Sequence, residues 1–343
     1  MQPEKVTTAA RLAGELAPML TMSVRKPIGT NVRKTAASRR ANERRGMLCQ
    51  MDRTGRVYPA LSIPAQPVRP PVRGQKDAMT TTSQDGTRIA FDRAGQGPAV
   101  IFVDGALCYR ASGPSASVAA LLKEHFTVYT YDRRGRGDSG DTAPYAIERE
   151  VEDIAALIAE AGGTAGVCGV SSGAVLALDA ASRLPGISRL ALYEAPFIVD
   201  DTKPPLPLDF QSRLKDAVAA GRRSDAVKMF LQLVGVPGFG VAIMRLMPVW
   251  KKLTAVAHTL PYDISIVEPN QHGRPLSAAH WTQATMPTLA INGGKSPAYM
   301  RNGMRALARA LPGATYRTLP GQAHMINAKA LVPVLTEFFA DRS

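Results

Sequence analysis

The stretch AGVCGVSSGAV, residues 165–175, decides the fold of this chain. An apolar run of strand length, residues 165–170, leads into two serines and a glycine, and a segment of helical periodicity follows. Residues 169–173, GVSSG, match the pattern G-x-S-x-G. This pattern needs small residues on both sides of the serine, because the strand turns into the helix too sharply for side chains there. It predicts a strand–turn–helix unit with Ser171 at its tip.

A serine at such a tip has a specific chemical environment. Its hydroxyl projects beside a helix N-terminus, where unpaired N–H groups and the helix dipole favour developing negative charge. The register predicts Ser171 as a nucleophile and the backbone N–H of Ser172 as a donor to an oxyanion. The structural alternative is a glycine–serine turn that only caps a helix. The remainder of the chain decides between the two.

Outward from this unit, strand and helix segments alternate from Met79 onward. Apolar runs of strand length lie at residues 98–105, 126–132, 165–170, 187–195, 287–293 and 315–321. Helix-period segments separate most of them, as at residues 117–125, 145–162 and 174–184. The alternation predicts an α/β fold: a mostly parallel central sheet covered by helices on both faces. Residues 197–285 break the rhythm with several helical stretches and no convincing strand, which predicts an all-helical lid inserted into a domain of residues 79–343.

The charge of the chain is unevenly distributed. Residues 1–78 contain 15 Lys and Arg against 5 Asp and Glu, a balance of +10, and residues 79–343 carry only +4. The first segment lacks sustained apolar periodicity, so we expect a disordered basic extension. It is either a targeting or nucleic-acid-binding arm or a stretch translated upstream of a natural start at Met79. Nucleic acid is therefore expected as a partner only through residues 1–78.

Composition narrows the remaining classes. Cys49, Cys108 and Cys168 are too few and too scattered for a disulfide framework, which predicts a reducing compartment, the cytoplasm. No apolar run approaches the length of a membrane span, and we expect no metal or cofactor. The G-x-G-x-x-G match at residues 135–140 is a poor dinucleotide motif, because no helix follows it directly.

At this point the chain resembles the α/β-hydrolase family over residues 83–340. An early strand in that family ends in His-Gly, where this chain has Asp104-Gly105, and the resemblance implies the backbone N–H of Ala106 as the second oxyanion donor. Residues 132–139, DRRGRGDS, are similar to the family's D-x-R-G-x-G-x-S turn. His324, in LPGQAHMI after the last strand, stands at the family's place for the general base.

The position of the acidic residue that pairs with the histidine departs from the commonest family pattern. A typical member has Asp after the strand that contains AIN, where this chain has Ser296, and a serine cannot stabilise an imidazolium by charge. Some members place the acid one strand earlier, and there LALYEAPF provides Glu194. A salt bridge is the structural alternative for this glutamate. Asp200 and Asp201 are reserve candidates.

The resemblance implies a carboxylesterase-like serine hydrolase that cleaves an ester or related acyl bond of a small, largely apolar substrate through an acyl-enzyme. Ser171 is the expected nucleophile, His324 the general base, and Glu194 the residue that orients the histidine. The N–H groups of Ala106 and Ser172 form the expected oxyanion hole.

Two other interpretations of the same fold stay open. One is a lyase or a cofactor-free oxygenase, and the other is a non-catalytic binding protein. The apolar side chains of the predicted lid either line a substrate pocket or pack helices onto the sheet; they are Phe239, Met244, Leu246, Met247 and Trp250.

Overall fold

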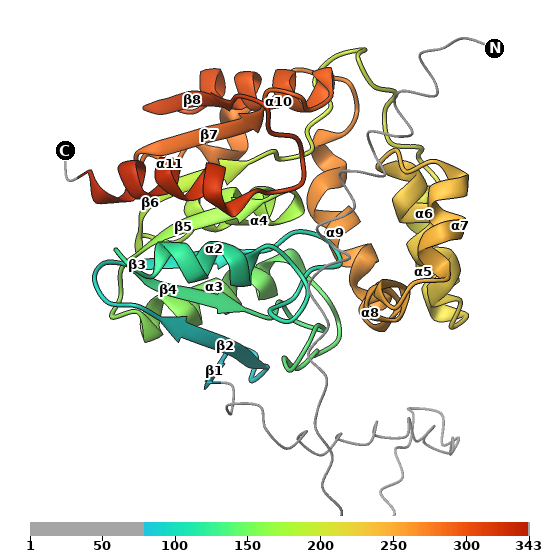
Figure 1. The fold of residues 1–343 in the computed structure, drawn as a ribbon, viewed down its shortest axis with the longest axis horizontal. Coiled ribbons are helices and arrows are strands. Elements are labelled where there is room, and N and C mark those ends of the chain that lie inside the picture. Colours follow the sequence, from blue (N-terminus) through green and yellow to red (C-terminus); the bar gives the residue numbers. More distant parts are fainter. Residues whose placement is uncertain (1–78, 342–343) are drawn as a thin grey trace, which may run out of the picture. The chain divides into compact units, whose positions relative to one another are not determined.

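The computed structural model describes residues 79–341 of the protein. Its strands span Met79–Thr82 (β1), Arg88–Ala94 (β2), Ala99–Val103 (β3), Thr127–Tyr131 (β4), Ala165–Val170 (β5), Ile187–Tyr193 (β6), Thr288–Gly293 (β7) and Ala314–Leu319 (β8). They form one sheet in the order β1-β2-β4-β3-β5-β6-β7-β8 (Figure 1). β1 pairs with β2, and β2 with β4, in antiparallel fashion, while every later pair is parallel.

Helices cover both faces of this sheet, so successive side chains along a strand point into two different hydrophobic cores. On β3, Val100 and Phe102 pack with the helices of one face, and Ile101 and Val103 with those of the other. The first face carries α2 (Ser115–Leu122) and α11 (Ala328–Ala340). The second carries α3 (Ile147–Glu160), α4 (Ser172–Ala181) and α10 (Ala298–Ala310). The predicted α/β fold with a mostly parallel, doubly covered sheet is confirmed.

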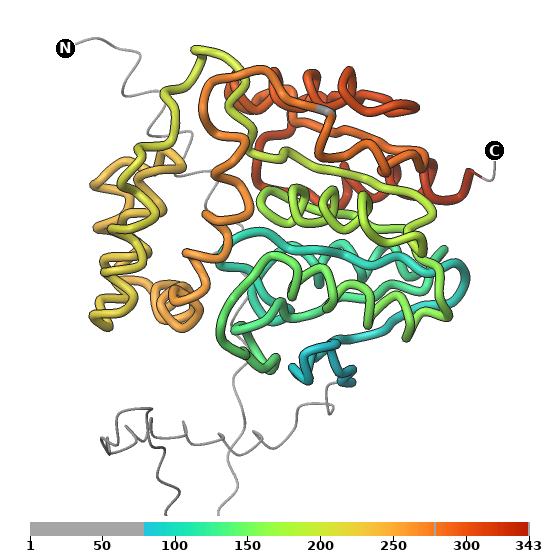
Figure 2. The backbone as a smooth tube through the Cα atoms, turned by 180° about the vertical axis from the view of Figure 1, so that it is seen from behind, coloured from blue at the N-terminus to red at the C-terminus, as the bar shows by residue number. Residues whose placement is uncertain are grey.

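Within residues 197–285 the structure has helices and no strand. They are α5 (Phe210–Ala219), α6 (Arg223–Leu233), α7 (Gly238–Arg245), α8 (Val249–Ala255) and α9 (Leu260–Val267), with single turns η1 (Ala257–Thr259), η2 (Glu268–Asn270) and η3 (Ala278–Trp281). Helices α5–α8 gather to one side of the sheet, and α9 lies between them and the sheet (Figures 1 and 2). That this segment acts as a lid stays a prediction.

The apolar side chains expected in the lid differ in their burial, and Met247 is half-buried. Met244 and Trp250 are buried, and the indole N–H of Trp250 donates to the Ser224 hydroxyl at 2.9 Å, so these two pack helices together. Phe239 and Leu246 are 55% and 89% exposed.

The expected extension, residues 1–78, lies outside the described residues, so its boundary with the domain stays a prediction. Among residues 79–341, no helix is long and apolar enough to cross a membrane.

Candidate active site

Ser171 occupies a strained turn between β5 and α4. Its φ of 54° and ψ of −124° lie in a region that side chains rarely adopt. The backbone holds this conformation with two hydrogen bonds. The Ser171 N–H donates to the Tyr193 carbonyl at 2.9 Å, and the Ser171 carbonyl accepts from Ala174 N–H at 3.0 Å. The turn is therefore anchored to the end of β6 and to the first turn of α4.

The two glycines of the pentapeptide are required by close backbone contacts. A Cβ atom on Gly169 would lie 2.4 Å from the Gly173 carbonyl oxygen, and one on Gly173 would lie 2.3 Å from the Val103 carbonyl oxygen. Both distances are far below van der Waals contact. The turn thus packs directly against its own helix on one side and against the end of β3 on the other.

The loop after β3 lies against Ser171. A Cβ atom on Gly105 would be 3.0 Å from the Cβ of Ser171 and 3.6 Å from its Oγ. The next residue, Ala106, is half-buried in the same loop. The structure thus brings the peptide that contains the Ala106 N–H next to the serine.

Glu194 follows β6 directly and is completely buried, at 0% exposure, with a positive φ of 50°. Its Oε2 lies 2.8 Å from Nδ1 of His324. Its Oε1 accepts the Gly293 N–H at 2.6 Å and the Ser296 hydroxyl. A buried carboxylate is costly unless it is paired and hydrogen-bonded, and these three donors meet that requirement.

The loop of His324 is fixed against the ends of β6 and β7. Tyr193 donates its hydroxyl to the Ala323 carbonyl at 2.6 Å, and the Lys295 N–H donates to the Gln322 carbonyl at 2.8 Å. The His324 side chain itself is 37% exposed, so its ring has one edge on the buried carboxylate and remains accessible. The backbone carbonyl of Tyr193 also accepts the Ser171 N–H, and this tyrosine therefore connects the serine turn with the histidine loop.

Ser296 has a contact that the sequence reasoning missed. It stands at the position where the commonest family pattern has its acid, and its hydroxyl donates to the Glu194 side chain. The two alternative positions of the family's acid could have predicted this contact. Residues at both positions must be able to reach the same histidine, so they must lie near each other. Asp200 is engaged elsewhere and accepts from the Asn302 side-chain amide at 2.7 Å, while Asp201 is exposed.

Asp104, where the family has histidine, is 1% exposed, and its two carboxylate oxygens have no hydrogen-bond partner among the described residues. Burial raises the pKa of Asp104 to about 6. The Ser115 hydroxyl lies close enough to oppose this rise but outside hydrogen-bond geometry, and the charges of Arg133 and Arg136 oppose it as well.

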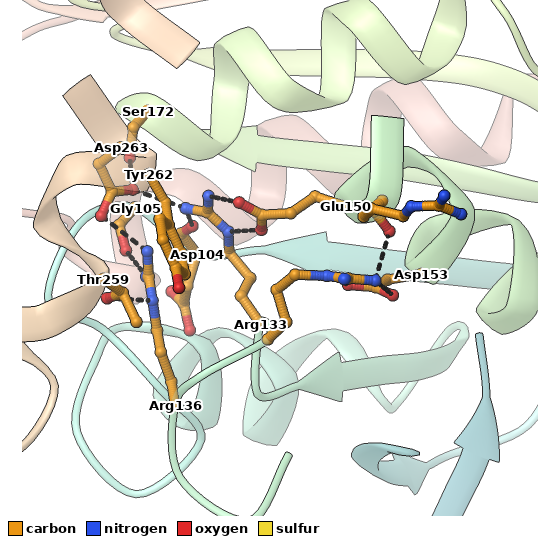
Figure 3. Close-up of polar contacts among 12 residues, drawn as sticks. Asp104, Gly105, Arg133, Arg136, Glu150, Asp153, Ser172, Thr259, Tyr262 and Asp263 are labelled. Carbon is orange, nitrogen blue, oxygen red and sulfur yellow. Dashed lines mark hydrogen bonds and ion pairs between the residues drawn. The ribbon is translucent and has the colours of Figure 1, made fainter. Parts of the chain in front are cut away.

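A buried network of charged side chains reaches Ser172 at the start of α4 (Figure 3). Arg133 makes two hydrogen bonds of 2.7 Å to Glu150 and one of 2.8 Å to Asp263. Arg136 binds the same Asp263 at 2.7 Å, and the Ser172 hydroxyl donates to it at 2.8 Å. Within residues 79–341, no group of His, Cys, Asp and Glu side chains is arranged to hold a metal ion.

Comparison with known proteins agrees with this architecture. Residues 97–334 match the model of the alpha/beta hydrolase family. An alpha/beta hydrolase from Sphaerobacter thermophilus is 50% identical over 76% of this chain and 100% of its own, with a TM-score of 0.70. Two further solved structures share the fold. An enol-lactonase from Burkholderia xenovorans is 22% identical over 77% of this chain and 100% of its own, with a TM-score of 0.58. A thermophilic esterase from Thermogutta terrifontis is 20% identical over 77% of this chain and 97% of its own, with a TM-score of 0.54. The chain therefore belongs to the alpha/beta hydrolase family, and this membership supports a hydrolase activity.

Proposed function

We propose that the protein is a serine hydrolase that cleaves an ester or related acyl bond of a small, largely apolar substrate through an acyl-enzyme. The observation that carries the proposal is the pairing of His324 with the buried carboxylate of Glu194 at 2.8 Å, on the sheet edge that also bears the Ser171 turn. A nucleophile, a base and an acid at one sheet edge are the parts that this chemistry needs.

The hydrogen bond to Glu194 assigns a tautomer to the histidine. Nδ1 of His324 carries the proton and donates to Oε2, so Nε2 has a lone pair to accept the Ser171 proton. As Ser171 Oγ bonds to the acyl carbon, the imidazole becomes positively charged, and the carboxylate stabilises it. The same proton then passes to the leaving alcohol as its bond to carbon breaks.

The negative charge that develops on the acyl oxygen needs donors beside Ser171. The N–H groups of Ala106 and Ser172 are assigned this role, since Gly105 contacts the serine and Ser172 begins α4. A water molecule then attacks the acyl carbon as its proton passes to His324. The Ser171–acyl bond breaks, His324 returns that proton to Ser171 Oγ, and the acid is released. An esterase and an enol-lactonase share this fold. An ester or lactone is therefore the first substrate class to test.

A fluorophosphonate probe tests the nucleophile directly. We expect covalent labelling of the wild type and hydrolysis of p-nitrophenyl butyrate, with loss of both in Ser171→Ala. Ser182→Ala, at the opposite end of α4, is the control and should keep both. Labelling that persists in Ser171→Ala would show that another residue reacts. A folded wild type that neither labels nor hydrolyses a panel of esters and lactones would overturn the proposal in favour of a non-catalytic binding protein.

A further inference from the structure

The carboxylate of Asp263 on α9 is linked to both segments that carry the proposed oxyanion donors (Figure 3). It binds the Ser172 side chain directly, and it reaches the Gly105–Ala106 peptide through Arg136. The Ser172 hydroxyl donates to Oδ1 of Asp263 at 2.8 Å. Arg136 donates from Nη2 to Oδ2 at 2.7 Å, and from Nη1 to the Gly105 carbonyl at 2.7 Å and the Cys108 carbonyl at 3.1 Å. One contact therefore reaches the residue at the start of α4, and the other reaches the loop that contains Ala106.

The Gly105 carbonyl accepts the 2.7 Å hydrogen bond from Arg136 and a longer one of 3.3 Å from the Cys108 N–H, and these two contacts set where the Ala106 N–H points. The Gly105 carbonyl and the Ala106 N–H belong to the same peptide unit, and in a trans peptide these two groups point in opposite directions. The guanidinium holds the carbonyl oxygen on the buried side, so the N–H is directed to the side away from Arg136. A glycine permits rotation of this peptide at low cost, and a flipped peptide would present an oxygen to the oxyanion.

The charged groups of this network are almost completely removed from solvent. Arg133, Arg136 and Asp263 are each 1% exposed. Arg133 also binds Asp263 at 2.8 Å and donates to the Asp104 carbonyl at 3.3 Å, so it supports the same loop from the neighbouring residue. Buried charge-assisted hydrogen bonds of this kind fix geometry strongly, because each broken bond leaves a charge without a partner.

We propose that Asp263, Arg136 and the Ser172 hydroxyl are positioning residues that hold both oxyanion donors in place before the substrate binds. The inference rests on the proposed function and adds the residues that orient the oxyanion hole. Helix α9 then has a specific role, because it carries the carboxylate that joins the loop after β3 to the start of α4. Donors that are already aligned cost no reorganisation as the negative charge develops.

The test compares p-nitrophenyl butyrate with its thiono analogue, in which sulfur replaces the carbonyl oxygen. Sulfur accepts hydrogen bonds poorly, so the ratio of kcat/KM for the oxygen ester to that for the thiono ester reports the contribution of the oxyanion hole. A merely structural change lowers the amount of active enzyme and leaves this ratio unchanged. The variants are Arg136→Met, Asp263→Asn and Ser172→Ala.

The matched control is Arg134→Met. Arg134 is an equally buried arginine of the same turn, but its hydrogen bonds go to Asp153, Asp85 and the Arg149 carbonyl. We expect Arg136→Met and Asp263→Asn to lose about 10- to 100-fold in kcat for the oxygen ester. Their KM should stay within about threefold, and their oxygen-to-thiono ratio should fall by about tenfold. Ser172→Ala should change in the same direction by a smaller factor, and Arg134→Met should keep the wild-type ratio.

The outcomes separate this inference from the proposed function. A wild type without Ser171-dependent turnover overturns both. An active wild type whose oxygen-to-thiono ratio is unchanged in Arg136→Met and Asp263→Asn overturns only the positioning role. If those two variants do not fold, Ser172→Ala decides, because it removes no charge: an unchanged ratio there overturns the inference, and a lowered ratio supports it.

Discussion

Glu194 shows how one residue reconciles burial with charge. It is completely buried, yet it accepts hydrogen bonds from the Gly293 N–H and the Ser296 hydroxyl and pairs with His324. Its positive φ of 50° turns the chain sharply at the end of β6. Ser296 supports the buried glutamate, because it supplies a hydrogen-bond donor at the position where the commonest family pattern has its acid.

Glu194→Gln should keep the shape of the side chain and remove the charge that stabilises the imidazolium. We expect a loss in kcat of about 10⁴ with the fold intact. Ser296→Ala should lose roughly tenfold, since it removes one hydrogen bond to the carboxylate, about 1–2 kcal/mol. Steady-state kinetics on p-nitrophenyl butyrate measure both. The exposed Asp201→Asn is the control, and full activity in Glu194→Gln would rule out the glutamate as the acid.

Asp104 should make stability depend on pH. Its pKa in the folded protein, about 6, lies above the ordinary value of 3.8, so the folded state binds this proton more tightly than the unfolded state. The associated stabilisation is fully present below about pH 4 and is lost as the pH rises through about 6. Asp104→Asn removes the titration, so the Tm of the wild type should fall relative to that of the variant between about pH 5 and pH 8. Thermal melts of both proteins at the two pH values measure this change. A Tm difference between wild type and variant that is the same at both pH values would contradict the raised pKa of Asp104.

At the scale of elements, the unit β5–Ser171–α4 is built by close approach of backbones rather than by side-chain packing. Gly169 packs against the first turn of α4, and Gly173 packs against the carbonyls of Val103 and Asp104 at the end of β3. Helix α4 therefore starts directly beside the loop that carries Ala106. This proximity brings the backbone N–H groups of Ala106 and Ser172 near Ser171.

Gly173→Ala should destabilise the protein strongly, because the added methyl group would overlap the Val103 carbonyl oxygen at 2.3 Å. Overpacking of this kind costs about 1–3 kcal/mol or more. Gly238→Ala is the matched control, since nothing lies within 4 Å of its added methyl at the start of α7. It should be neutral or stabilising by up to about 1 kcal/mol. Urea unfolding measures both, and equal stability of the two variants would show that the turn tolerates a side chain.

At the scale of the whole molecule, the sheet organises the site because its parallel strands end at one edge. Ser171 follows β5, Glu194 follows β6, the Gly293–Ser296 turn follows β7, and His324 follows β8. β5, β6, β7 and β8 are consecutive neighbours in the sheet. Residues that are up to 153 positions apart in the chain are therefore brought to one edge by strand order alone.

Removal of residues 1–78 should leave the Tm and the hydrolytic activity almost unchanged. The sequence of this segment lacks apolar periodicity, and all strands of the described sheet begin at or after Met79. The same deletion should abolish any affinity for nucleic acid, because it removes a net charge of +10. Calorimetry and a binding titration with a short DNA duplex measure the two effects. A Tm lower by more than about 5 °C would show that the segment contributes to the folded domain.

The sequence by itself determined the α/β architecture and the approximate positions of the candidate residues. Apolar runs of strand length and helical periodicity are local properties, and they are sufficient to order strands and helices along the chain. G-x-S-x-G is equally readable as a local pattern, although only Gly169 answers to a contact within the turn and Gly173 answers to the Val103 carbonyl of β3. Glu194 could be singled out because a glutamate at the end of an apolar strand needs a partner.

Only the tertiary structure decided which residues are the hydrogen-bond partners of these buried polar groups. Ser172 and Asp263 are 91 positions apart, and Arg136 and Asp263 are 127 apart. No periodicity connects them, since these contacts exist only after α9 packs against α4 and meets the turn that follows β4. The hydrogen bond from Ser296 to Glu194 spans 102 positions in the same way. Short-range patterns reflect which face of an element is buried, whereas pairing between buried polar groups depends on where elements meet in space. The serine turn was therefore visible in the sequence, and the network that supports it was not.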